Sequence, residues 1–84
     1  MNKNLTKQWI KERDEAAKSY DVEKFKAFYR KYSRLGIYNY ILPPDEVIEI
    51  TMRKMVCNIT SATKEEVAEA RAWLHIRGYT EDIY

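Results

Sequence analysis

The fold is decided by one segment, DVEKFKAFYRKYSRLG, which spans residues 21–36. Its apolar side chains recur at intervals of three and four residues, which places them on one face of a helix. These side chains are Val22, Phe25, Phe28, Tyr29, Tyr32 and Leu35. Asp21 suits the position before a helix, and Gly36 accepts the left-handed backbone that often ends one. The segment therefore predicts an amphipathic helix over residues 21–35.

The same reasoning extends outward to three further helices. Pro44-Asp45-Glu46 is typical of a helix start, because proline costs no hydrogen bond in the first turn and acids favour the positive end of the helix dipole. Thr63 and Glu66 have the spacing of a capping box, and Gly78 is placed to end the helix that follows. We predict helices at about residues 5–19, 21–35, 44–60 and 64–77, no strands, and a frayed tail at residues 80–84.

The predicted fold class is all-α: a compact four-helix bundle of two helical hairpins joined by an aromatic loop. Residues 19–21, Ser-Tyr-Asp, are interpreted as the turn of the first hairpin, with a kink in one long helix as the alternative. The loop at residues 37–42, IYNYIL, has strand-like composition, but no partner strand is evident. The 84 residues form one domain, 1–84.

Composition narrows the class of protein. Hydrophobic residues make up 45% of the chain, which is enough for a core without disulfide bonds. There is one cysteine, Cys57, which favours a reducing compartment, and no apolar run approaches the length of a membrane span. No signal-peptide pattern is present at the N-terminus. We therefore expect a cytoplasmic protein with no membrane partner.

Positive charge is concentrated in the first half of the chain. Residues 1–36 carry ten Lys/Arg against five acids, whereas residues 37–84 carry five against eight, within a total net charge of +2. The polar face of the second helix forms a candidate basic surface of Lys24, Lys26, Arg30, Lys31 and Arg34. Such a surface can pair with phosphates, although an ordinary solvated helix face has the same composition.

A second route to DNA is a helix-turn-helix made by the last two predicted helices. We disfavour it, because Glu65, Glu66 and Glu69 would stand where that motif meets base edges. The loop residues Tyr38 and Tyr40 form a candidate aromatic site that can stack on bases, anchor a protein interface, or cover the core. We favour the last interpretation.

The third predicted helix is the most apolar, and its apolar residues exceed what one packing face requires. Its polar strip includes Glu49 and Arg53, which are spaced for a helical ion pair. The surplus defines a candidate apolar interface of Val47, Ile50, Cys57, Trp73 and Ile76 on the third and fourth helices. Two-fold dimers are the commonest way to bury such a face. We therefore expect a homodimer or a complex with another protein.

No catalytic, cofactor-binding or metal-binding constellation is recognisable. His75 is the single histidine, and one histidine with one cysteine cannot complete a tetrahedral zinc site. The sequence resembles no family known to us. The favoured prediction is a small cytoplasmic, non-enzymatic protein-interaction module that associates with itself. The alternative is an accessory nucleic-acid-binding protein that uses the basic surface of the first hairpin.

Overall fold

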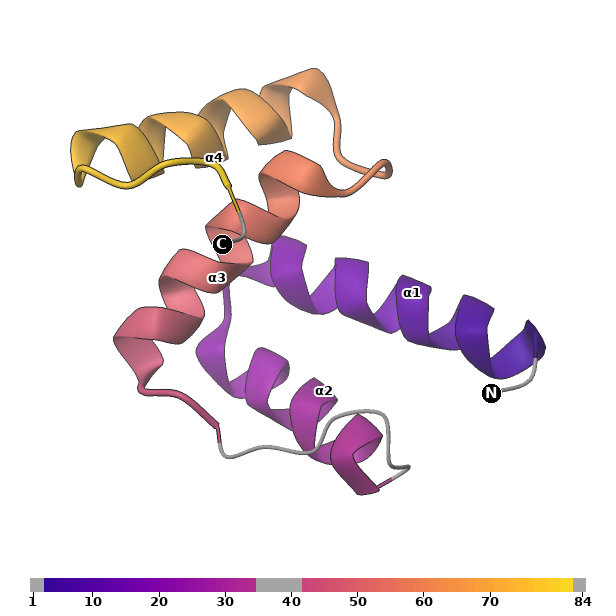
Figure 1. Ribbon diagram of the computed structural model, residues 1–84. Coiled ribbons are helices and arrows are strands. Elements are labelled where there is room, and N and C mark those ends of the chain that lie inside the picture. The colour runs from indigo at the N-terminus through magenta and orange to yellow at the C-terminus, as the bar shows by residue number, and fades with distance from the viewer. Residues whose placement is uncertain (1–2, 35–41, 83–84) are drawn as a thin grey trace.

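The computed structural model describes residues 3–34 and 42–82 (Figure 1). Four helices follow one another in these ranges: α1 (Lys3–Ser19), α2 (Val22–Arg34), α3 (Asp45–Asn58) and α4 (Lys64–Ile76). No strand occurs among the described residues. The predicted all-α fold is therefore confirmed, and α1 with α2 and α3 with α4 form its two hairpins.

Helix α3 is the centre of the molecule. The α1–α2 hairpin packs on one side of it, and α4 crosses it on the other side, at the top of Figure 1. Helices α2 and α4 do not pack on each other. This arrangement explains the apolar character of α3, since a helix covered from two sides must be apolar on both.

The core consists of two connected clusters. The larger one joins the hairpin to the first half of α3, and its buried members are Ala16, Phe25, Phe28, Tyr32, Ile48 and Met52. The smaller one contains Ala17, Val56 and Ala70, and brings the end of α1 to α3 and α4. Ala17 is fully buried in this smaller cluster.

Three predicted capping signals act at helix ends in the structure. The Asp21 carboxylate accepts the backbone N–H groups of Glu23 and Lys24 at 2.9 and 3.3 Å. Thr63 and Glu66 form the predicted capping box at the start of α4. After α4, Gly78 has a φ of 81°, and the backbone N–H of Tyr79 donates to the carbonyl of Leu74 at 2.9 Å.

The observed helix bounds differ from the approximate predicted ones by one or two residues. Helix α1 begins at Lys3, and α3 runs from Asp45 to Asn58 instead of from 44 to 60. Pro44 precedes α3, where its carbonyl accepts the first helical hydrogen bonds at 3.0 and 3.1 Å. At the other end the extended backbone of Ile59 stops the helix.

The break between α1 and α2 is a turn and not a kink. Tyr20 has a φ of 53°, a left-handed conformation that interrupts a helix. The Ser19 hydroxyl donates to the carbonyl of Ala16 at 2.7 Å and accepts the backbone N–H of Asp21 at 3.1 Å. The chain thereby reverses within two residues, which confirms the predicted hairpin.

Candidate functional site

The predicted basic surface lies on the side of α2 that faces away from the core. Lys24, Arg30, Lys31 and Arg34 are exposed, and Lys26 is partly buried. Two of the five cations already have acidic partners. The Lys26 Nζ lies 2.7 Å from an Asp45 carboxylate oxygen, and the Lys31 Nζ lies 2.6 Å from a Glu12 oxygen.

The ion pair of Lys26 joins α2 to the first residue of α3. Its hydrogen bond to Asp45 raises the pKa of the Lys26 ammonium group, with a smaller contribution from Glu23 at 3.6 Å. The ammonium therefore stays charged, and it remains engaged with these acids. Lys26 therefore links α2 to α3 and contributes little free positive charge to the surface.

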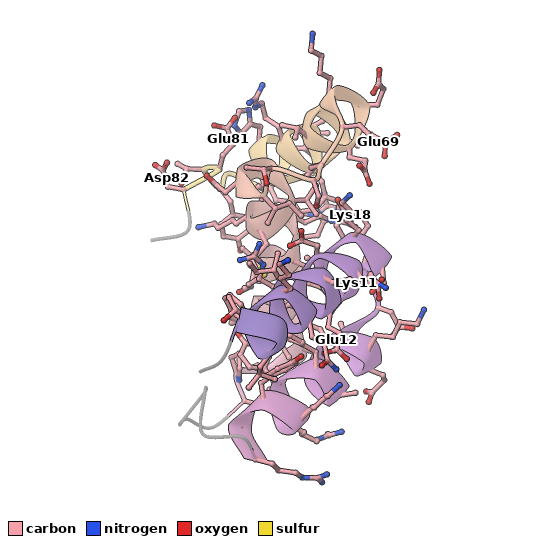
Figure 2. All side chains as sticks on the ribbon, turned by 90° about the vertical axis from the view of Figure 1, so that its right-hand side faces the viewer. Lys11, Glu12, Lys18, Glu69, Glu81 and Asp82 are labelled. Carbon is pink, nitrogen blue, oxygen red and sulfur yellow. The ribbon has the colours of Figure 1, made fainter. Side chains whose placement is uncertain are left out.

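Glu12, on α1, links α1 to α2 in the way that Lys26 links α2 to α3 (Figure 2). Its carboxylate accepts hydrogen bonds from Lys31 and from the hydroxyl of Tyr32, the buried aromatic residue of α2. Partial burial opposes ionisation of Glu12, but these hydrogen bonds outweigh it and lower the pKa of the carboxyl group. The charged form of Glu12 is therefore the one that stabilises the hairpin.

This predicts a specific sensitivity to acid. A carboxyl whose pKa is lower in the folded state stabilises the protein above its unfolded pKa, about 4.3 for Glu, and the contribution disappears as the pH falls through the folded pKa. We expect Glu12→Gln to flatten the decline of the unfolding free energy below about pH 4.5. Urea unfolding at several pH values measures this. The matched variant Glu49→Gln, on an exposed residue of α3, should keep the wild-type slope, and equal slopes in all three proteins would contradict the assignment.

A shallow hollow lies on the exposed side of α2. It has a volume of about 450 Å³ and is lined by Ala27, Arg30, Lys31 and Arg34. A second hollow of about 350 Å³ lies alongside, between α1 and α2, and there Glu12 and Glu15 face Lys24. The first hollow is therefore bordered by cations, whereas the second carries both signs of charge.

The predicted apolar interface is not one continuous patch. Ile76 is 82% exposed and Val47 is 45% exposed, whereas Ile50, Cys57 and Trp73 are half-buried. Val47 belongs to the first turn of α3 and Ile76 is the last residue of α4, and Figure 1 shows that these two helix ends lie apart. The central position of α3 accounts for much of the apolar surplus that the sequence displayed.

Trp73 belongs to a stack that sequence analysis missed. The Arg53 guanidinium lies 3.4 Å from the ring centroid of Tyr20 and 4.8 Å from that of Trp73. Arg77 lies over Trp73 at 4.0 Å. The predicted pair of Arg53 with Glu49 is therefore wrong: Arg53 points across to the turn after α1 and to α4. Stacked cations and rings attract each other, so this stack ties three parts of the chain together.

The C-terminal tail is held in place as far as the structure describes it. The carboxylate of Glu81 pairs with Arg71 and lies 3.2 Å from Nε2 of His75. Its backbone carbonyl accepts the side-chain amide of Asn58 at 2.8 Å. Residues 80–82 form no helix, and the predicted fraying of the tail stays a prediction. Cys57 is half-buried, and burial, together with the negative charge of Glu81, raises the pKa of its thiol.

The other predicted site features find no further support. Tyr38 and Tyr40 lie outside the described residues, as do Leu35, Gly36 and most of the aromatic loop. Within the described ranges, no three His, Cys, Asp or Glu side chains gather where they could hold a metal ion. No helix in those ranges is both long enough and apolar enough to cross a membrane.

Comparisons with known proteins give no match for this chain. No protein-family model matches it, and searches of curated proteins and of solved structures give no match either. Two features of the surface remain as candidates for function: the basic side of α2 and the exposed Ile76 on α4.

Proposed function

We propose that this protein is a small, non-enzymatic interaction module that associates with itself through the exposed side of α4. The observation that carries the proposal is Ile76, an isoleucine with 82% of its surface in water. Ala68 and Ala72 precede it at intervals of four residues and are also exposed. We call these three residues the α4 outer face.

A single exposed isoleucine is common on protein surfaces, so its neighbours matter. Residues four apart lie on one side of a helix, and Ala68, Ala72 and Ile76 therefore form a line. Alanine side chains allow another helix to approach closely. The line thus has a small-residue part and one large apolar side chain that no described residue covers.

Such a line fits a second copy of itself. If two α4 helices cross in antiparallel orientation with Ala72 at the two-fold axis, Ile76 of each copy meets Ala68 of the other. A large side chain then faces a small one twice, which is the reciprocal pattern that a two-fold interface requires. The contact is limited to one helix from each protomer, so we expect a weak dimer. The single cysteine suits a reducing compartment, and we assign the protein to the cytoplasm.

The test is the molar mass in solution. We expect the wild-type protein to approach the mass of a dimer at high micromolar concentration, and Ile76→Glu to remain monomeric because its charge would be buried at the interface. Ile10→Glu is the matched control, since Ile10 is another exposed isoleucine, 39% exposed, on α1. Light scattering measures all three proteins. Equal loss of association in both variants would assign the effect to added charge and not to α4.

A further inference from the structure

A second surface, on α2, is rich in positive charge, and most of its cations have no acidic partner among the described residues. We define the α2 outer face as Lys24, Ala27, Arg30, Lys31 and Arg34. Lys24, Arg30 and Arg34 are exposed and form no ion pair with any described residue. Lys31 pairs with Glu12, yet 46% of its side chain remains accessible. Three or four cations of this face are therefore available to an external anion.

The shape of the α2 outer face suits an extended ligand. Ala27 has only a methyl group at the point where Arg30, Lys31 and Arg34 border the hollow of about 450 Å³. With a helical rise of about 1.5 Å per residue, Arg30 and Arg34 are about 6 Å apart along the axis, and the cations from Lys24 to Arg34 cover about 15 Å. A ligand with repeated negative charges can therefore contact several of them at once.

We propose that the α2 outer face binds the phosphate backbone of a nucleic acid. An interface with a protein draws most of its energy from a few buried anchors, commonly Trp, Tyr or Arg packed into apolar pockets. The α2 outer face has no aromatic anchor, since Phe25, Phe28 and Tyr32 are buried in the core, and its arginines lie beside other cations. Phosphate binding needs no apolar anchor, because cations that displace counterions supply the affinity. Arginine also presents a fork of donors that matches phosphate oxygens.

The distribution of charge over the whole molecule also favours binding of a polyanion through α2. The α1–α2 hairpin contains the ten Lys/Arg and five acids of residues 1–36, whereas the rest of the chain has an excess of three acids. Figures 1 and 2 show α2 at one end of the molecule and α4, with Glu69, Glu81 and Asp82, at the other. This polarity would turn α2 toward a polyanion and α4 away from it. The proposal does not depend on self-association, because one protomer carries the complete face.

The experiment is fluorescence anisotropy with short labelled oligonucleotides, one single-stranded and one duplex, across a range of salt concentrations. A short probe accommodates one protomer, so the result does not depend on dimer formation. Three or four phosphate contacts predict that the slope of log K against log salt lies between about −2.7 and −3.6 for the duplex. Binding of both probes is expected, since a backbone is common to both.

The decisive comparison is between two pairs of substitutions with equal change in net charge. Arg30→Gln with Arg34→Gln should make the duplex slope shallower by about 1.8, because two phosphate contacts are lost. Lys54→Gln with Lys64→Gln, on α3 and α4, should leave the slope unchanged. Far-UV circular dichroism verifies that both variants are folded. If neither probe binds at low salt, or if both variants lose affinity equally, the proposal is wrong. Binding of polyglutamate without binding of either oligonucleotide would also overturn it, and would assign the face to an acidic protein.

Discussion

Phe25→Ala is expected to lower the free energy of unfolding by about 3–5 kcal/mol. Phe25 is 1% exposed and lies between the hairpin and α3. Its ring meets that of Tyr29 edge-on with centroids 4.8 Å apart, and that of Phe28 at 6.0 Å. Truncation removes these contacts and leaves a cavity that the surrounding helices cannot fill completely.

The size of this effect is large for such a short chain. Stabilities of about 0.05–0.15 kcal/mol per residue give about 4–13 kcal/mol for 84 residues. Phe25→Ala is therefore expected to remove a large part of the stability, and urea unfolding followed by circular dichroism measures the loss. Phe25→Leu is the matched control, because it keeps most of the apolar volume and should lose much less. Similar losses for the two variants would show that the ring is not packed as described.

Leu74→Ala is expected to destabilise the protein by about 2–5 kcal/mol. Leu74 is fully buried, and with Ala70 it provides the buried contacts of α4. Because α4 packs on α3 and not on α2, no other helix can compensate for the loss. We expect both the unfolding free energy and the protection of α4 amides from hydrogen exchange to fall.

The matched control lies two residues further along the same helix. Ile76 has a side chain of the same size as Leu74 but is 82% exposed, so Ile76→Ala should change the stability of the monomer by no more than about 0.5 kcal/mol. The comparison must be made at low protein concentration, where self-association does not contribute. A loss of several kcal/mol in Ile76→Ala would contradict the placement of Ile76 outside the core.

Features that depend on near neighbours in the sequence were predictable. Asp21, Thr63 and Gly78 each act on backbone groups within a few residues, so their identity and position were sufficient to place helix ends. The apolar spacing in residues 21–36 likewise indicated which side of α2 is buried, and Phe25, Phe28 and Tyr32 are indeed in the core. Helical periodicity depends only on nearby residues in the sequence, and the side of the helix that it marks as apolar is the buried side in the folded chain.

Contacts between distant parts of the chain were not predictable in the same way. The sequence suggested a pair of Arg53 with Glu49, because these residues are one helical turn apart. In the structure Arg53 instead contacts the rings of Tyr20 and Trp73, which only the packing of three elements brings together. The tie between Asn58 and Glu81 has the same origin. Sequence spacing alone carries no information about such partners.

The candidate surfaces changed for the same reason. Lys26 and Lys31 belong to the predicted basic surface, but tertiary packing provides them with Asp45 and Glu12. Of the predicted apolar interface, Trp73 is covered by Arg53 and Arg77, and Ile76 remains exposed. Fewer of the predicted surface residues therefore remain available to another molecule, and they lie at the two ends of the protein.

The two proposals are compatible, because the surfaces lie at opposite ends. A dimer formed through the α4 outer faces would leave both α2 outer faces accessible, one on each protomer. Linking two weak phosphate-binding faces raises the overall affinity for a long nucleic acid when both can reach it. Self-association would then strengthen the binding of nucleic acid, although each of the two properties can be measured without the other.

Sedimentation equilibrium of the unmodified protein, from low to high micromolar concentration, tests the central claim most directly. If the α4 outer face mediates self-association, the apparent mass will rise from the 10.1 kDa of the monomer toward twice that value. A mass that stays at 10.1 kDa over the whole range would contradict the account.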